Sequence, residues 1–503
     1  MSIRKNTIAN YLGQGYLTLV GIVVMPLYLQ YLGAEAYGLV GFFIMLQTWL
    51  NLLDIGLSPA FGRQVAYERG QQNDFIELTK LLRSFEIIFF IISISTILVI
   101  YSGSDWISRD WIKIQNLDHD VVSLCVVLMG LIIGLRWFGA LYKSGISGFE
   151  DQVWLNKLNI IMATGKFIGA LLLLEFISTE VVYFFQYQML VGVIEIILVT
   201  RRFYSKLPIT IYTYQIKFNW CSVKKVAPFA LGIAYTSGIW IVISKADKLI
   251  LSGILPINEF GYFTLVSVAA GGVAMMSSPI AQAVLPRMTM LLSQGKKNEM
   301  IILYRNTSQL ITVVALSTAL VMAIFSEKLL FAWTGNLEVS VWGRDVLFWF
   351  ALGNGVLALE GLQYYLQSSF GKLRLHIIGS TVSVLIQTPL IFYAASTFGA
   401  VGAGIAWFTF RSISFICWTP IVHQKFLPHF HMNWLIRDIA PIVLIAFISS
   451  YFLSYIFYLP EGGRVATLSI LACIGLVVLL AISLSSSFVR NSIQIRMLNR
   501  NGH

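Results

Sequence analysis

Residues 465–486 read VATLSILACIGLVVLLAISLSS, a run of 22 residues without a charged side chain. A helix of roughly 20 apolar residues crosses the hydrocarbon core of a bilayer, so this run predicts a membrane-spanning helix. Similar runs recur along most of the 503-residue chain, in which 57% of residues are hydrophobic and 12% are charged. Long apolar runs favour helices over a membrane β-barrel, whose alternating strands are about ten residues long. The sequence therefore predicts an all-α integral membrane protein.

About fourteen membrane-spanning helices are expected. An even number places both termini on the same side of the membrane. Of the 35 Lys and Arg, 25 fall in the tails and alternate loops on that side and 5 in the other loops, so the positive-inside rule places both termini in the cytoplasm. The expected spans are 9–30, 36–60, 84–101, 121–142, 155–175, 180–200, 226–251, 259–284, 303–326, 343–369, 376–396, 400–421, 438–458 and 465–486.

The chain contains an internal repeat at an offset of about 223 residues. LGAEAYGLVGF (32–42) resembles LPINEFGYFTL (255–265), and this alignment pairs Gly38 with Gly261. The offset contains six expected helices, so the two copies have the same orientation in the membrane. Further along the repeat, Arg63 aligns with Arg287, and Asn73 and Asp74 align with Asn298 and Glu299.

The repeat predicts two pseudo-symmetric lobes of six helices each. The first lobe is expected at 1–212 and the second at 213–432, with the basic stretch 201–225 connecting them. Residues 433–503 then supply the last two helices and a cytoplasmic tail. Two such lobes favour a transport pathway between them.

Five basic residues lie within the expected spans. Inserting a charge at a helix centre costs roughly 2.5–3.5 kcal/mol, so we expect most of them to face protein or a wet cavity. Two lie near mid-membrane and are the strongest candidates, whereas the other three can also extend to a headgroup region. The first two are Lys166 and Arg411, and the others are Lys245, Lys248 and Arg136.

Three carboxylates within the spans are candidates for gating or for coupling to a proton or sodium gradient. Each also has a structural interpretation, because an acid in the membrane can form an ion pair with a nearby base. Asp247 adjoins Lys248, and the other two can pair with an intramembrane arginine. The three carboxylates are Asp54, Glu360 and Asp247.

The remaining motifs do not indicate a cofactor or an enzyme. The four cysteines are scattered, and His423, His429 and His431 lack a zinc-like spacing, so we expect no disulfide and no metal site. The sequence has neither a Walker loop nor a G-x-S-x-G nucleophile elbow, and we expect no catalytic residue. The net charge of +11 comes from bases spread over many loops, which does not indicate nucleic-acid binding.

Several stretches carry a resemblance to a known family. They are PLYLQYLGAEAYGLVGF (26–42), DIGLSPAFGRQVA (54–66), DKLILSGILPINEFGYFTLV (247–266) and VLPRM (284–288). With them, the chain resembles the polysaccharide and O-antigen flippase (Wzx) family of the multidrug/oligosaccharidyl-lipid/polysaccharide exporter superfamily. The motifs cover most of residues 10–300, and the rest of the resemblance is the helix count.

The resemblance implies a flippase of the bacterial inner membrane that works by alternating access. The two MATE-like lobes would enclose a cationic cavity for a polyprenyl-diphosphate-linked oligosaccharide, whose tail stays among the membrane lipids. The five intramembrane bases would line this cavity, because Lys and Arg bind phosphate through charge-assisted hydrogen bonds. Other polysaccharide assembly proteins are candidate partners.

Two alternatives stay open at this point. A drug/cation antiporter of the same superfamily would share the fold but favours an acid-dominated cavity. A membrane-embedded polysaccharide polymerase or glycosyltransferase would need a sizeable loop with catalytic acids. The longest expected external loop, 102–120, has only 19 residues.

Overall fold

The computed structural model describes residues 3–71, 76–207, 218–456, 463–486 and 490. The repeat residues Asn73 and Asp74, and part of the expected basic connection 201–225, lie outside this set. The described residues are almost entirely helical, and they contain no β-strand beyond one isolated bridge between Lys113 and Pro256. The expected all-helical fold is confirmed.

The chain forms two compact units, Met1–Gly261 and Tyr262–His503, called here the N-terminal and C-terminal units. Helix α9 (Trp220–Ile254) packs against α2, α3 and α4 and belongs to the N-terminal unit. The division therefore lies one helix later than the boundary expected at residue 212. The repeat-based lobes stay a prediction.

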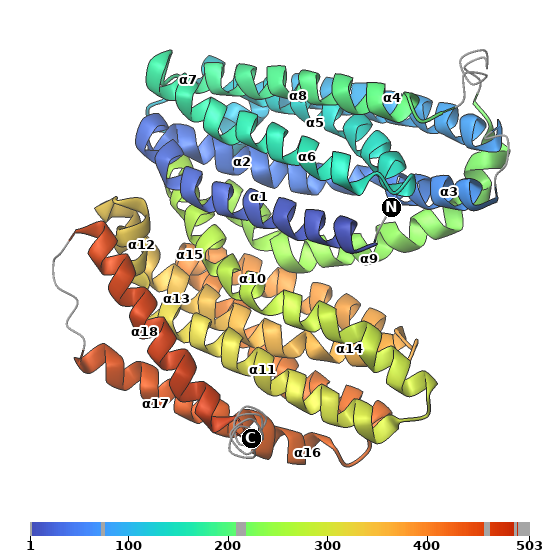
Figure 1. Cartoon of the computed structure of the whole chain (residues 1–503). Coiled ribbons are helices and arrows are strands. Elements are labelled where there is room, and N and C mark those ends of the chain that lie inside the picture. Colours follow the sequence, from blue (N-terminus) through green and yellow to red (C-terminus); the bar gives the residue numbers. More distant parts are fainter. Residues whose placement is uncertain (1–2, 72–75, 208–217, 457–462, 487–489, 491–503) are drawn as a thin grey trace. The chain divides into compact units, whose positions relative to one another are not determined.

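The helices of the N-terminal unit run side by side (Figure 1). Their apolar faces meet in a core that is rich in buried aromatic side chains. Besides α9, the unit contains α1 (Ile3–Leu32), α2 (Ala34–Leu50), η1 (Asn51–Asp54), α3 (Leu57–Gln71), α4 (Ile76–Trp106), η2 (Ile107–Trp111), α5 (His119–Gly148), α6 (Gln152–Thr164), η3 (Gly165–Gly169), α7 (Ala170–Phe176) and α8 (Val181–Tyr204).

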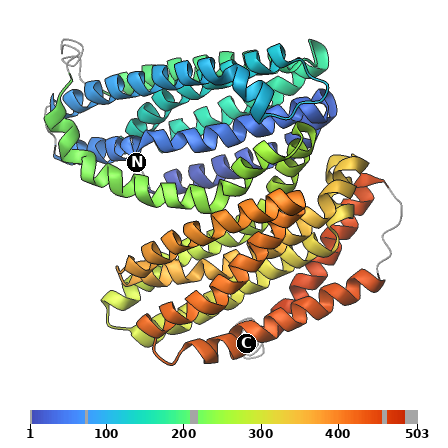
Figure 2. The same cartoon turned by 180° about the vertical axis from the view of Figure 1, so that it is seen from behind.

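The C-terminal unit is a second helical bundle, seen from behind in Figure 2. Buried residues of α11, α17 and α18 form one apolar cluster, which packs the last two long helices against this unit. The helices are α10 (Ile257–Ser293), which begins in the N-terminal unit, α11 (Lys297–Ile324), α12 (Ser326–Thr334), α13 (Leu337–Glu360), α14 (Leu362–Ser369), α15 (Arg374–Phe426), α16 (His431–Trp434), η5 (Leu435–Ile439), α17 (Ala440–Ile456) and α18 (Arg464–Ser485).

Among the described residues, 13 helical segments are long and apolar enough to cross a membrane. The longest, α15, contains a non-helical residue at its middle, Gly399, with φ 61° and ψ −146°. Only glycine readily adopts this conformation, because a Cβ atom would clash with the backbone. Gln387 and Arg411, each twelve residues from Gly399, are hydrogen-bonded to each other. Therefore α15 is two antiparallel helices, as the expected spans 376–396 and 400–421 require.

The two repeat glycines lie against each other in the N-terminal unit. A Cβ atom on Gly261 would lie 3.2 Å from the Cα atom of Gly38, and one on Gly38 would lie 2.0 Å from the carbonyl oxygen of Ile257. Because that oxygen belongs to the backbone, it cannot move aside as a flexible side chain would. Glycine at both positions permits α2 and the start of α10 to touch.

We expect Gly38→Ala to destabilise the protein by about 1–3 kcal/mol, the typical cost of overpacking a filled interior. The measurement is thermal unfolding of the purified protein in detergent. Gly21→Ala on α1 is the matched control, because a Cβ atom there meets nothing within 4 Å. Equal melting temperatures for the two variants would contradict the close approach.

Candidate functional site

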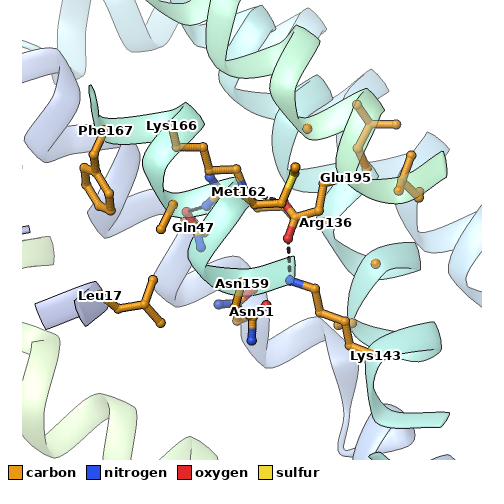
Figure 3. Close-up of a pocket in the computed structure, with 16 residues that line it drawn as sticks. Leu17, Gln47, Asn51, Arg136, Lys143, Asn159, Met162, Lys166, Phe167 and Glu195 are labelled. Atoms are coloured by element: carbon orange, nitrogen blue, oxygen red, sulfur yellow. Dashed lines mark hydrogen bonds and ion pairs between the residues drawn. The ribbon is translucent and has the colours of Figure 1, made fainter. Parts of the chain in front are cut away.

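The N-terminal unit contains a cavity of about 480 Å³, lined by residues of α1, α2, α5, α6, η3 and α8. Two of the predicted site residues, Arg136 and Lys166, line it together. The other charged residues in its wall are Lys143 and Glu195 (Figure 3). The cavity therefore gathers three bases and one acid among apolar side chains and three amides, Gln47, Asn51 and Asn159.

Lys166 lies in η3, a single π-helical turn between α6 and α7. The carbonyl group of Lys166 accepts hydrogen bonds from Tyr28 Oη at 2.9 Å and from Gln188 Nε2 at 2.8 Å. Tyr28 Oη also lies 3.0 Å from the carbonyl oxygen of Phe167. Side chains from α1 and α8 thus satisfy backbone groups of a turn that departs from α-helical geometry. Such π-turns occur frequently at functional sites.

Glu195 connects the two lysines of the cavity. Its Oε1 is bonded to Lys143 Nζ and its Oε2 to Lys166 Nζ, so each carboxylate oxygen holds one ammonium group. The side chain of Glu195 is 10% exposed, against 29% for Lys143 and 18% for Lys166. Each ammonium group has three N–H donors and uses one of them on Glu195. The lysines therefore keep donors for a further anion.

Arg136 supplies the third positive charge. Its Nη1 donates to Gln47 Oε1, and its guanidinium group lies over the ring of Phe43, 5.2 Å from the ring centre. Its Nε is buried and has no hydrogen-bond partner among the residues that the structure describes. An unpaired buried donor is costly, so Arg136 is suited to an additional acceptor.

The backbones of the four charged residues lie at increasing depth from the end of the unit where α5 and α8 terminate and α6 begins. Lys143 is five residues from that end, Glu195 nine, Arg136 twelve and Lys166 fourteen. At about 1.5 Å per helical residue, these depths are roughly 8, 14, 18 and 21 Å. Because Glu195 bonds both lysines, their ammonium groups meet at its carboxylate, and the charges gather in one place below these helix ends.

Arg411 lies in the C-terminal unit and is 3% exposed. Its Nη1 is 3.1 Å from an oxygen of Glu360, its Nη2 donates to Gln387, and its guanidinium group lies 4.6 Å from the ring centre of Trp407. Ser414 Oγ donates to the other oxygen of Glu360 at 2.6 Å. The expected ion pair between Glu360 and an intramembrane arginine is present. A substrate role for Arg411 and a gating role for Glu360 stay predictions.

The remaining predicted site residues do not line the cavity. Lys245, Asp247 and Lys248 lie on α9, and within the part of the chain that the structure describes Asp247 forms no ion pair within 4.0 Å with either lysine. Asp54 accepts hydrogen bonds from the backbone N–H of Ser58 at 3.0 Å and from its hydroxyl group at 2.9 Å, which stabilises the start of α3. Substrate and gating roles for these residues stay predictions.

Two members of the cavity, Lys143 and Glu195, were not among the residues predicted from the sequence. Lys143 follows directly after the expected span 121–142, and Glu195 lies within the expected span 180–200. The spacing of seven residues between Arg136 and Lys143 was the available signal, because it places both on one face of α5. No comparable pattern pairs Glu195 with residues of α5 and η3.

Many helices that are long and apolar enough to span a membrane, together with a charged cavity in one helical unit, place this chain in the class of polytopic membrane transporters. A family model described as polysaccharide biosynthesis protein matches residues 3–292, more than half of the chain. The chain belongs to this family.

Sequence and structure comparisons agree with this assignment. A Shigella flexneri protein described as an O-antigen transporter is 20% identical over 410 residues, which cover 81% of this chain and 94% of that protein. The inward closed structure of the lipid II flippase MurJ matches 98% of this chain and 100% of its own with a TM-score of 0.72 and 15% identity. An inward-facing multidrug transporter of the MATE family matches 85% of this chain and 95% of its own with a TM-score of 0.60 and 14% identity. The two structures share the fold.

Proposed function

We propose that this protein is a flippase for a polyprenyl-diphosphate-linked oligosaccharide, such as an O-antigen or other surface polysaccharide repeat unit. It carries this lipid from the cytoplasmic to the outer face of a bacterial inner membrane by alternating access. The observation that carries the proposal is the cavity of the N-terminal unit, where Arg136, Lys143 and Lys166 surround a space of about 480 Å³.

The chemistry of the cavity suits a diphosphate group. Ammonium and guanidinium groups offer charge-assisted hydrogen bonds that replace the water lost from an anion inside the membrane. At neutral pH a diphosphate diester carries about one negative charge per phosphate. Three bases and one acid leave a net charge of +2 in the cavity wall, and such a ligand would neutralise it.

The depth of the charges supports entry from the cytoplasm. The positive-inside rule places the end of the unit nearest Lys143 on the cytoplasmic side. A diphosphate entering there would meet the ammonium groups of Lys143 and Lys166 together at Glu195, with Arg136 in the same cavity. The polyprenyl tail would stay in the surrounding lipid.

The comparisons favour this substrate over the alternatives. One relative is described as an O-antigen transporter, and one structure with the same fold is named a lipid II flippase. A drug/cation antiporter would need an acid-dominated site, whereas bases outnumber acids in this cavity. Because the relatives are transporters, we also propose that the chain is not an enzyme.

Depleting the protein should cause lipid-linked repeat units to accumulate on the cytoplasmic face of the inner membrane, while the surface glycan disappears. The measurement is the fraction of lipid-linked glycan in right-side-out and inverted vesicles that a membrane-impermeant glycosidase can cleave. Accumulation on the outer face would indicate a polymerase instead, and an unchanged distribution would contradict the flippase proposal.

A further inference from the structure

The two lysines of the cavity are already bonded to an anion, and this anion is a side chain of the protein itself, Glu195. Glu195 is nearly buried and bonds one lysine through each carboxylate oxygen, which is how an anionic ligand would engage them. Arg136 also lies close enough to Glu195 to interact electrostatically. Figure 3 shows the side chains of Glu195, Lys143 and Lys166 together at the cavity, with Glu195 on α8, a helix that packs against the α5 of Lys143.

A carrier that works by alternating access has to change conformation both loaded and empty. With its ligand bound, the cavity is electrically balanced. Without ligand, three bases alone would leave three uncompensated positive charges inside the bilayer, where each unpaired charge is unfavourable. A carboxylate at the centre of the group lowers this cost in the empty state.

The same carboxylate competes with the ligand. Phosphate oxygens and the Glu195 oxygens are hydrogen-bond acceptors for the same ammonium groups, and charge-assisted bonds to either are of similar strength. Although each lysine has further N–H donors, both anions draw on the same positive charge, so a diphosphate that binds Lys143 and Lys166 weakens their contact with Glu195. Binding is weaker than it would be without this competitor, and release is correspondingly easier.

We propose that Glu195 is a built-in counter-anion that holds Lys143 and Lys166 in the empty carrier and exchanges with the substrate's diphosphate. This inference rests on the proposed function and adds the step that resets the cavity after each release. Glu195 would thus regulate the affinity for the diphosphate and the rate of turnover. A purely structural ion pair, or a fixed contact to the substrate, would do neither.

The N-terminal unit provides a matched control in a second carboxylate held between two bases. Asp151 is buried, and one of its oxygens lies 3.0 Å from Arg202 Nε and 3.0 Å from Lys206 Nζ. Burial opposes ionisation of this carboxyl group, but the hydrogen bonds and charges of Lys206 and Arg202 outweigh it and lower its pKa. Asp151 does not line the cavity, so its loss removes a similar ion-pair cluster without changing the binding groups.

The experiment compares Glu195→Gln with Asp151→Asn in the full-length protein. Farnesyl diphosphate, titrated in detergent, measures affinity for the lipid diphosphate group, and surface glycan in cells that depend on the variant measures delivery. We expect Glu195→Gln to bind farnesyl diphosphate about tenfold more tightly, because a competitor is removed, and to deliver at least about tenfold less glycan. Asp151→Asn should change the affinity by less than about twofold.

Glu195→Asp is a second variant that keeps the test informative if the Gln variant does not fold. Its shorter carboxylate keeps the charge but reaches the lysines less well, so we expect a smaller gain in affinity and partial delivery. If the Gln or the Asp variant binds farnesyl diphosphate as the wild type does or more weakly, Glu195 is not a competing anion and the inference is wrong. Tighter binding with normal delivery would equally overturn the resetting role.

Failure of the proposed function would look different. In that case the wild type would not bind farnesyl diphosphate, and variants of the cavity lysines would deliver glycan normally. A different result would overturn only the counter-anion role of Glu195. The wild type would bind farnesyl diphosphate and glycan delivery would depend on the lysines, but Glu195→Gln would not change the affinity.

Discussion

Replacing Lys143 and Lys166 together by glutamine should reduce surface delivery of the glycan by at least about a hundredfold. Each lysine would lose a charge-assisted hydrogen bond to the diphosphate, worth about 1.5–3 kcal/mol. The combined loss of about 3–6 kcal/mol corresponds to two or more powers of ten in affinity. Delivery is measured by antibody against the surface glycan, normalised to the amount of protein in the membrane. The single variants should show intermediate losses.

The control for the lysine variants is Lys157→Gln. Lys157 is exposed on α6, the helix that leads to Lys166, and it does not line the cavity. Surface delivery of the glycan by the Lys157→Gln variant should stay close to that of the wild type. Normal delivery from the double variant of Lys143 and Lys166, at wild-type membrane levels, would remove the cavity from the mechanism.

Breaking the buried ion pair of the C-terminal unit should have the largest effect on folding. Glu360→Ala leaves the guanidinium group of Arg411 buried without its counter-charge, which costs about 3–5 kcal/mol. We expect most of this variant to be lost from the folded fraction in fluorescence-detected size-exclusion chromatography. Normal yield and melting temperature would show that the pair is not needed for stability.

A double variant separates the two roles considered for Arg411. Replacing both members by methionine removes both charges and keeps apolar volume, so folding should largely return. Because Arg411 is 3% exposed and already bonded to Glu360 and Gln387, we expect delivery to return with folding. A folded double variant that does not deliver glycan would instead support the substrate role predicted from the sequence.

Only part of the candidate site could be predicted from the sequence. Lys166 and Arg136 stood out because charges inside apolar runs are unfavourable unless something compensates them. Glu195 was visible as an acid, but its partners lie 29 and 52 residues away on other elements. Which charges meet depends on how each helix is rotated about its axis, and apolar runs that face lipid as well as protein give a weak signal for that rotation.

The helical membrane architecture, with its spans where the apolar runs lie, follows from the amino-acid sequence without any tertiary information. Hydrophobicity is a property of each residue and adds up along a run, so the membrane selects these segments before any tertiary contact forms. The turn at Gly399, between two expected spans, is also encoded locally. In contrast, the folded structure was needed to show that Lys143, Arg136 and Lys166 share one cavity, that Glu195 joins two of them, and that Arg411 pairs inside its own unit. These contacts join residues that are distant in sequence, so they depend on how the helices pack. In a bilayer, side-chain shape and hydrogen bonding, rather than hydrophobicity, determine which helix faces meet.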